Sequence, residues 1–283
     1  MITASVVLFE SPRDHIVELV KSIQKSNIYI KAFFWDNSHT DELAELIPDD
    51  DQFKYIKSDR NLGFGAGHNK VMKQLIEGSD YHLVINPDIK FAPNTISLLK
   101  NFMDSNPDIG LALPKIFDLN GNEQPLFKLL PSPLDLIFRR FWPKKLKHLI
   151  EGRLNRYILS FANPNIVNDA PYLSGCFMMI RSKVFENVGY FDERFFLYCE
   201  DLDYSRRINQ KWRTTYFPGA EVSHIYGGGS YIYTKLMFCH AISAIKYFNK
   251  YGWVDNERNR INRETVFNLG KYKFYEVANE KSN

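Results

Sequence analysis

The chain has 283 residues, 45% hydrophobic and 24% charged, with a formal net charge of +3. These values are ordinary for a globular protein, and the net charge is too small to indicate a nucleic-acid partner. Three sparse cysteines exclude a disulfide framework and a zinc site, and the chain shows neither a signal peptide nor a run of roughly 18 apolar residues, so we expect a cytoplasmic protein.

The first 117 residues alternate between strand and helix patterns. Short apolar runs predict strands at residues 4–9, 28–35, 53–58, 81–86 and 109–117. Apolar residues at helical spacing predict helices at residues 14–26, 65–78 and 92–107. Such alternation is typical of an α/β fold with a mostly parallel central sheet flanked by helices.

Asp36, Asp59 and Asp88 each follow a predicted strand. Because ligands of such sheets bind beyond the carboxyl ends of the strands, we expect the three aspartates at one rim. Asp88 ends an Asn-Pro-Asp sequence, which is either a plain turn or a position that holds a divalent cation with a diphosphate.

The segment "SDRNLGFGAGHN" (58–69) places three glycines before a predicted helix. Glycine lets the backbone approach a ligand, and a helix N-terminus favours anions, although a simple turn uses the same residues.

Glu200, Asp201 and Asp203 gather at the start of another predicted helix. They either cap this helix or include a general base whose pKa is raised by burial and mutual repulsion. His224 ends a later strand and is either structural or part of the site, and glycines at 227–229 follow it.

The pattern breaks between about 118 and 168, where a stretch rich in arginine, lysine and large apolar residues predicts a basic, amphipathic helical insertion. Its residues 134–156 suit the surface of an anionic membrane or the diphosphate of a lipid-linked acceptor, and a solvated helical arm explains them equally well. Residues 231–253 predict a long amphipathic helix that packs on the core or contacts a membrane.

Five segments occur in a characteristic order: "DNS" (36–38), "NLGFGAGHN" (61–69), "NPD" (86–88), the block from Tyr172 to Ile208, and "VSH" (222–224). Together they resemble the inverting glycosyltransferases of family 2, especially their rhamnosyltransferase-like members. The resemblance implies a GT-A catalytic domain over residues 1–230, with the insertion at about 118–168, and a C-terminal helical extension over residues 231–283.

The resemblance also implies roles for individual residues. Asp201 matches the catalytic base, with Glu200 beside it, and Asp88 and His224 match ligands of Mg²⁺ or Mn²⁺. The implied contacts to the nucleotide sugar are Asp36, Asn37, Asp59, Arg60, Asn61, Gly63, Gly67, Asn69, Asn86, Asp88 and Gly175. Residues 227–230 match a mobile segment over the donor. The first strand departs from the family pattern, because Glu10 or Ser11 stands where a Thr-Tyr-Asn type turn is usual.

The implied function is inverting transfer of a sugar from a nucleoside diphosphate to an acceptor in surface polysaccharide synthesis. L-Rhamnose from dTDP-rhamnose is the favoured donor, and the acceptor is a saccharide or a polyprenyl-diphosphate-linked saccharide. Such an acceptor implies action at the inner face of the cytoplasmic membrane, with peripheral contact through residues 134–156.

Several alternatives remain open. They are a UDP-hexose or galactofuranosyl transferase of the same fold, and a non-catalytic protein that binds nucleotide sugars. A nucleotidyltransferase is disfavoured, because the first strand lacks a basic glycine-rich signature. The oligomeric state is left open.

Overall fold

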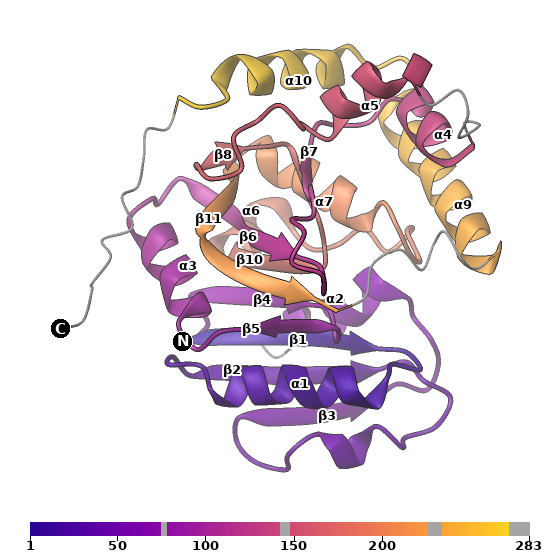
Figure 1. Cartoon of the computed structure of the whole chain (residues 1–283). Helices are drawn as coiled ribbons and strands as arrows, with labels where there is room; N and C mark the ends of the chain where they lie inside the picture. The colour runs from indigo at the N-terminus through magenta and orange to yellow at the C-terminus, as the bar shows by residue number, and fades with distance from the viewer. Residues whose placement is uncertain (75–77, 142–147, 226–233, 272–283) are drawn as a thin grey trace.

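The computed structural model describes residues 1–74, 78–141, 148–225 and 234–271 (Figure 1). Within these residues, nine strands form one sheet flanked by helices, which confirms the predicted α/β architecture. In spatial order the strands are β3 (Phe53–Lys57), β2 (Ile30–Asp36), β1 (Ile2–Leu8), β4 (Tyr81–Ile85), β10 (Phe177–Arg181), β6 (Ile109–Phe117), β11 (Arg213–His224) and β5 (Ile89–Phe91), while β8 (Asn168–Asp169) pairs with β11.

The sheet is parallel in its N-terminal half and mixed beyond it. Strands β3, β2, β1 and β4 run parallel, as the alternating pattern predicts. Strand β10 runs antiparallel to both β4 and β6, and β11 runs parallel to β6 but antiparallel to β5. The antiparallel β10 comes from the chain after residue 170, where the strand–helix alternation has already ended.

Helices cover the sheet and bury its central strands. The helices of the first half are α1 (Arg13–Gln24), α2 (Phe64–Gln74) and α3 (Thr95–Asp104), with a short 3₁₀ turn η1 (Ala44–Leu46). Helix α2 packs on β1 and β2, and α3 packs on β6 and β11. Every residue of β4 is buried, as expected for a central strand covered on both faces. Further along the chain lie α6 (Lys183–Val188) and α7 (Glu200–Asn209).

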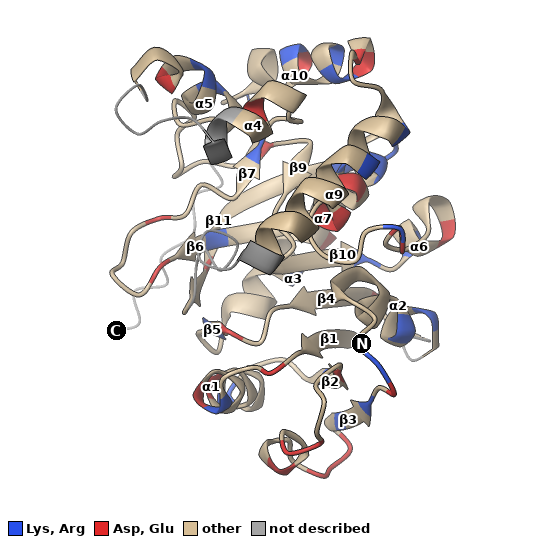
Figure 2. Ribbon diagram, turned by 90° about the vertical axis from the view of Figure 1, so that its right-hand side faces the viewer, with Lys and Arg blue, Asp and Glu red and all other residues tan. Residues whose placement is uncertain are grey.

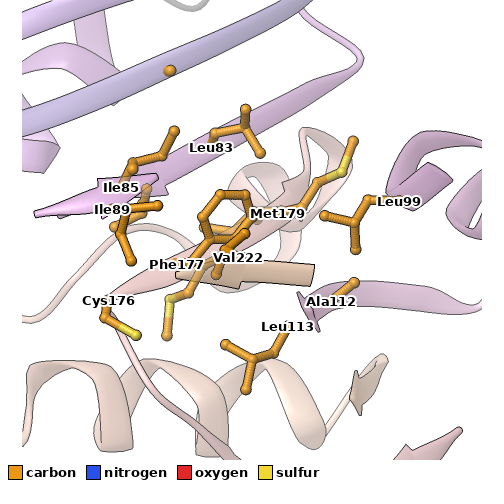
Figure 3. Packing of buried hydrophobic residues seen from close by; sticks show 14 of the residues in the cluster. Leu83, Ile85, Ile89, Leu99, Ala112, Leu113, Cys176, Phe177, Met179 and Val222 are labelled. Carbon is orange, nitrogen blue, oxygen red and sulfur yellow. The ribbon is translucent and has the colours of Figure 1, made fainter. Parts of the chain in front are cut away.

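The main hydrophobic core surrounds β10. Phe177 is fully buried, and Figure 3 shows it among Ile85, Ile89 and Val222 from three other strands. These strands come from distant parts of the sequence, so the core ties the end of β4 to the end of β11. The same packing therefore brings the segment after β4 close to His224.

A second layer of structure lies beyond the sheet. Strand β7 (Phe127–Lys128) pairs antiparallel with β9 (Tyr172–Leu173), and the helices α4 (Pro133–Phe141), α5 (Glu151–Tyr157), α9 (Thr234–Tyr251) and α10 (Asn256–Asn268) lie at this end of the molecule (Figure 1). A small buried cluster joins Leu130, Leu202, Tyr247 and Ile261. The C-terminal helices are thereby packed against α7 and the segment that precedes α4.

The basic stretch forms two short helices, α4 and α5, in its described part. Residues 142–147 lie outside the described residues, as do 226–233 with the predicted glycine segment 227–230. The domain boundary at residue 230 and the membrane contact of residues 134–156 stay predictions. Among the described helices, none combines the length and the apolar character that crossing a membrane requires.

We expect Phe177→Ala to lower the free energy of unfolding by about 3–5 kcal/mol, because it leaves a cavity at the centre of the core. Phe267→Ala is the matched control, since Phe267 is 76% exposed, and it should change stability by less than about 0.5 kcal/mol. Urea unfolding measures both variants. Equal effects would contradict this assignment of the core.

Candidate active site

The carboxyl ends of the parallel strands carry the first group of predicted site residues. Asp36 is the last residue of β2 and is fully buried. Its carboxylate accepts hydrogen bonds from the Tyr55 hydroxyl (2.6 Å) and from the backbone N–H of Ser38 (2.8 Å). Burial and this contact with Asp36 raise the pKa of Tyr55, which keeps the hydroxyl a donor. These two hydrogen bonds thus hold the side chain of Asp36 in position at the rim.

Asn37 fastens the glycine-rich loop to this rim. Its amide nitrogen donates to the Gly63 carbonyl (3.1 Å), and its oxygen accepts from the N–H of Leu62 (3.2 Å). Asn61 also accepts from the Gly63 N–H (2.8 Å). Gly63 has φ +85°, and a Cβ there would lie 2.1 Å from the Phe196 carbonyl oxygen. Only glycine therefore fits between this loop and the segment before α7.

The remaining predicted residues of this loop take different positions. Asp59 and Arg60 are exposed at the rim. Gly67 lets α2 approach β1, because a Cβ there would lie 2.8 Å from Val7. Asn69 is buried, and its amide bonds both the N–H (3.0 Å) and the carbonyl (2.9 Å) of Phe191. The described contacts of Gly67 and Asn69 are thus with the chain itself, and their roles toward a donor stay predictions.

Asp88 and His224 meet at the end of β11. Strand β11 pairs with β5 so that His224 lies opposite Ile89, next to Asp88. The Asp88 Oδ2 atom lies 3.2 Å from His224 Nε2, and His224 Nδ1 lies 3.2 Å from the Gln124 oxygen. Asp88 is 9% exposed, and its Oδ1 is buried without a hydrogen-bond partner among the described residues.

These contacts fit a divalent cation. If Nδ1 donates to Gln124, then Nε2 and the carboxylate meet as two acceptors unless a proton or a metal ion lies between them. The unpartnered Oδ1 offers a further oxygen of the kind that Mg²⁺ and Mn²⁺ prefer. The described residues contain no cluster of three or more histidine, cysteine, aspartate or glutamate ligands, so diphosphate oxygens and water would complete the shell.

Asp201 lies in the first turn of α7, half-buried and held by hydrogen bonds. Its Oδ2 accepts from the Gly175 N–H (3.0 Å) and the Tyr172 hydroxyl (3.3 Å), and its Oδ1 accepts from the Leu202 N–H (2.8 Å). A Cβ on Gly175 would lie 2.9 Å from the Asp201 Cβ, so glycine is needed for this approach. The Oδ2 atom of Asp201 is thus held by Tyr172 on β9 and by Gly175 in the turn that follows β9.

Glu200 and Asp201 share a site poor in solvent. Burial raises the pKa of Asp201. Burial and then the charge of Asp201 raise the pKa of Glu200 to about 8, and its Oε2 is buried without a hydrogen-bond partner among the described residues. Asp201 accepts three hydrogen bonds, so it ionises first, and Glu200 stays neutral at pH 7. Asp201 is therefore suited to accept a proton.

Cys176 links the two acidic centres. The Asn86 N–H donates to the Cys176 carbonyl (2.9 Å), next to the Gly175 N–H that bonds Asp201. Burial, together with the negative charges of Asp88 and Asp201, raises the pKa of the Cys176 thiol to about 12. Both carboxylates therefore lie near this one turn. The structure thus brings together the predicted residues at 88, 201 and 224.

Lys128 and Tyr172 complete this centre, and our sequence analysis did not single them out. The Lys128 ammonium lies 5.2 Å from the centre of the Tyr172 ring, and its positive charge favours the ionised form of Asp201. The two residues meet through the pairing of β7 with β9, two strands of two residues each. Such short strands have no detectable periodicity, so only the polar types of these residues were available as a signal.

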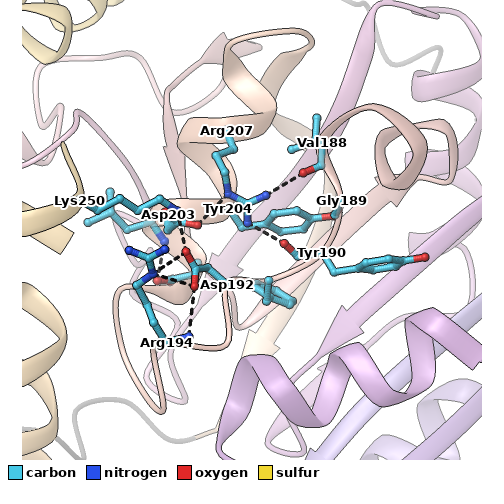
Figure 4. Close-up of polar contacts among 12 residues, drawn as sticks. Val188, Gly189, Tyr190, Asp192, Arg194, Asp203, Tyr204, Arg207 and Lys250 are labelled. Atoms are coloured by element: carbon cyan, nitrogen blue, oxygen red, sulfur yellow. Dashed lines mark hydrogen bonds and ion pairs between the residues drawn. The ribbon is translucent and has the colours of Figure 1, made fainter. Parts of the chain in front are cut away.

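A network of charges holds α7 in place (Figure 4). Asp203 is fully buried and accepts from Arg207 (2.8 Å), Lys250 (2.5 Å) and Tyr251 (2.8 Å). Lys250 also pairs with Asp192 (2.8 Å), before α7. Helix α9 thus supplies the cation that joins both ends of the segment carrying Asp201.

Comparison with known proteins gives three findings. The model of the family described as Glycosyl transferase family 2 matches residues 6–189. The N-acetylglucosaminyl-diphospho-decaprenol L-rhamnosyltransferase of Mycobacterium tuberculosis is 27% identical over 233 residues, 76% of this chain and 73% of that protein. The rhamnosyltransferase WbbL of Escherichia coli is 22% identical over 227 residues, 77% of this chain and 81% of that protein.

A solved structure is similar as well. The mannosyltransferase PcManGT from Pyrobaculum calidifontis, in complex with GDP-Man and Mn²⁺, superposes with a TM-score of 0.60 at 13% identity. The match covers 95% of this chain and 69% of that one. At this identity the likeness concerns the fold alone, and it confirms the predicted GT-A fold.

We expect Lys250→Met to lower the free energy of unfolding by about 1.5–3 kcal/mol, because Asp203 and Asp192 lose a charged hydrogen-bond donor. Lys246→Met is the matched control on the same helix, since Lys246 is exposed and bonds only the Arg194 carbonyl among the described residues. Chemical denaturation measures both. A loss for Lys246→Met as large as for Lys250→Met would contradict the role of this network.

Proposed function

The chain belongs to glycosyl transferase family 2, and on this premise we propose that it transfers a sugar with inversion from a nucleoside diphosphate to a lipid-linked saccharide. We propose L-rhamnose from dTDP-rhamnose as the sugar, because the Mycobacterium and Escherichia coli relatives are both named rhamnosyltransferases. A polyprenyl-diphosphate-linked acceptor is supported by the name of the Mycobacterium relative. Such an acceptor would place the enzyme at the inner face of the cytoplasmic membrane.

One observation carries the proposal. Asp201 accepts a hydrogen bond from Gly175, and Asn86, two residues before Asp88, donates one to the Cys176 carbonyl, so the proposed base and the proposed cation-binding pair border the same turn. An inverting transfer needs both functions at once, because a proton leaves the acceptor while charge grows on the departing diphosphate.

Asp201 acts as the general base in this proposal. Its ionised carboxylate takes the proton from an acceptor hydroxyl, and the oxygen forms a bond to the anomeric carbon. The bond from that carbon to the diphosphate breaks on the opposite face, so the configuration inverts without a covalent enzyme intermediate. The N–H groups of Gly175 and Leu202 fix the carboxylate, and its raised pKa strengthens it as a base.

Asp88 and His224 would hold Mg²⁺ or Mn²⁺, with Gln124 orienting the imidazole. A divalent ion bound there neutralises negative charge on the diphosphate of the donor. The rim formed by Asp36, Asn37 and the loop from Asp59 to Gly63 would border the nucleotide, and Asn86 lies next to Asp88. Glu10 accepts hydrogen bonds from the N–H (3.0 Å) and the ring (2.8 Å) of His39. We propose that Glu10 or Ser11 takes the place of the usual turn after the first strand.

UDP-hexose and galactofuranose donors use the same catalytic residues, so the choice of sugar is decided by assay. A panel of nucleotide sugars with Mn²⁺ identifies the donor by the release of nucleoside diphosphate. Release from none of them, in the presence or absence of acceptor, would favour the non-catalytic alternative.

Substitutions of Asp201 and Glu200 show which of these two neighbouring acids acts as the general base. We expect Asp201→Asn to lower kcat by about 10²–10⁴-fold, because the proton acceptor is lost. Glu200→Gln replaces a carboxyl that is neutral at pH 7, so its loss should stay below about tenfold at that pH.

The pH profile gives a further check on this assignment. Activity should fall as pH drops through the raised pKa of Asp201, since the base must be unprotonated. Glu200→Gln should remove any inflection near pH 8. A loss for Glu200→Gln equal to that for Asp201→Asn would instead assign the base to Glu200.

A further inference from the structure

A cleft of about 870 Å³ opens between α5 and α10, away from the proposed donor site. Figure 2 shows basic residues on both helices at this end of the molecule. Its charged lining consists of one aspartate and four arginines: Asp135, Arg153, Arg156, Arg258 and Arg263. Since the whole chain has a net charge of only +3, this lining is a strong local excess of positive charge.

One of the four arginines makes an ion pair within the described part of the chain, and the carboxylate of Asp255 also interacts electrostatically with Arg258. Asp135 pairs with Arg153 at 2.6 Å. Arg156, Arg258 and Arg263 have no carboxylate within 4.0 Å in the described ranges. The cleft therefore presents three guanidinium groups without a close ion pair to a ligand of opposite sign.

Arg258 gives independent evidence for a ligand. It is 8% exposed, and its Nη1 is buried without a hydrogen-bond partner in the described part of the chain. Its Nη2 reaches only Asn259, at 3.4 Å. A buried guanidinium with unmade hydrogen bonds is unfavourable, and an anion in the cleft would relieve this cost.

An apolar groove lies on the other side of α4. It is lined by Leu136 and Ile137 from α4, by residues of α9 that include Ile245 and Phe248, and by Trp253. Helix α4 contacts both α5 and α9, and its Asp135 faces the arginine-lined cleft. A charged cleft and an apolar groove are thus separated by one helix.

The cleft also connects to the catalytic centre. Leu129 and Leu130 line its inner side and directly follow Lys128, which acts on Asp201. Leu130 belongs to the same buried cluster as Leu202, the residue after Asp201. The same cluster contains Phe248 of the apolar groove, so the cleft and the groove both border the segment that carries Asp201.

We propose that this cleft binds the diphosphate of a polyprenyl-diphosphate acceptor, and that the groove between α4 and α9 receives the first isoprene units. The inference rests on the proposed lipid-linked acceptor. Its chemistry matches these neighbouring sites, because such an acceptor joins a sugar to a diphosphate and an apolar chain, and the cationic cleft and the apolar groove both border the segment of Asp201. Arginine suits this ligand, since its planar donors bind phosphate oxygens in pairs.

Binding of geranylgeranyl diphosphate tests the proposal, with geranylgeraniol as the uncharged probe. Calorimetry is done in EDTA without donor, so that the proposed metal site does not contribute. We expect the wild-type protein to bind the diphosphate at least about tenfold more tightly than the alcohol. The double variant Arg156→Ala/Arg263→Ala should lose most of this preference, and both side chains are exposed, so the fold should tolerate the change.

Arg260→Ala is the matched control, because Arg260 is also exposed on α10 but pairs with Glu264 and does not line the cleft. It should keep the wild-type preference. Equal binding of diphosphate and alcohol by the wild-type protein, or an equal loss in Arg260→Ala, would overturn the proposal. Thermal melting of each variant shows whether a loss of binding arises from unfolding. If the alanine variant is unfolded, Arg156→Lys/Arg263→Lys is measured in its place.

Vesicles separate an acceptor diphosphate from a phospholipid headgroup. Binding is measured to phosphatidylcholine vesicles with and without phosphatidylglycerol. If the alanine variant loses binding to anionic vesicles but keeps its preference for the prenyl diphosphate, the cleft recognises headgroups and the proposal is wrong. We expect the alanine variant to keep its binding to anionic vesicles and to lose its preference for the prenyl diphosphate.

Turnover of nucleotide sugars by the wild-type protein, without acceptor, tests the proposed function separately. A protein that turns over a donor yet binds diphosphate and alcohol equally overturns this inference alone. A protein that binds the diphosphate through these arginines yet turns over no nucleotide sugar overturns the proposed function alone.

Discussion

The site depends on holding carboxylates close together and out of water. Asp88, Glu200 and Asp201 lie around the turn at residues 174–176, and burial raises the pKa of Glu200 and that of Asp201. Asp201 keeps its charge through two backbone N–H donors and the nearby Lys128, and Glu200 avoids a second charge by staying protonated. Asp88 and Glu200 each keep a buried carboxyl oxygen without a hydrogen-bond partner within the described ranges. The unpartnered oxygen of Asp88 belongs to the carboxylate that lies beside His224, so a divalent cation would complement it.

The C-terminal helices are part of this balance, although they lie beyond the residues that match the family model. Lys250 neutralises Asp203 beside the base, and the buried Arg206 pairs with Asp255 at 2.7 Å. Of these two helices, α10 forms one wall of the arginine-lined cleft. Helices α9 and α10 thus pack as one unit around α7. They carry residues that hold the segment of the proposed base in place and residues proposed to bind the acceptor.

Much of this arrangement could be predicted from local patterns. The strand that ends before Asp88, the helix that begins at Glu200 and the strand that ends at His224 all lie where periodicity placed them. The antiparallel entry of β10 and the pairing of β7 with β9 could not be predicted, because they join segments far apart in sequence through very short strands. Lys128 was missed for that reason. Asn69 shows the converse, since its type suits a ligand contact while its amide holds the backbone of Phe191.

We propose that Asp88, His224 and Asp201 surround one place where a diphosphate-bound cation and an acceptor hydroxyl meet. Anomalous diffraction from crystals grown with Mn²⁺ and a nucleoside diphosphate locates this cation. We expect a single strong manganese peak within about 2.3 Å of an Asp88 carboxylate oxygen and of His224 Nε2, on the side of the turn that faces Asp201. A peak bound elsewhere, with Asp88 and His224 still paired to each other, would contradict it.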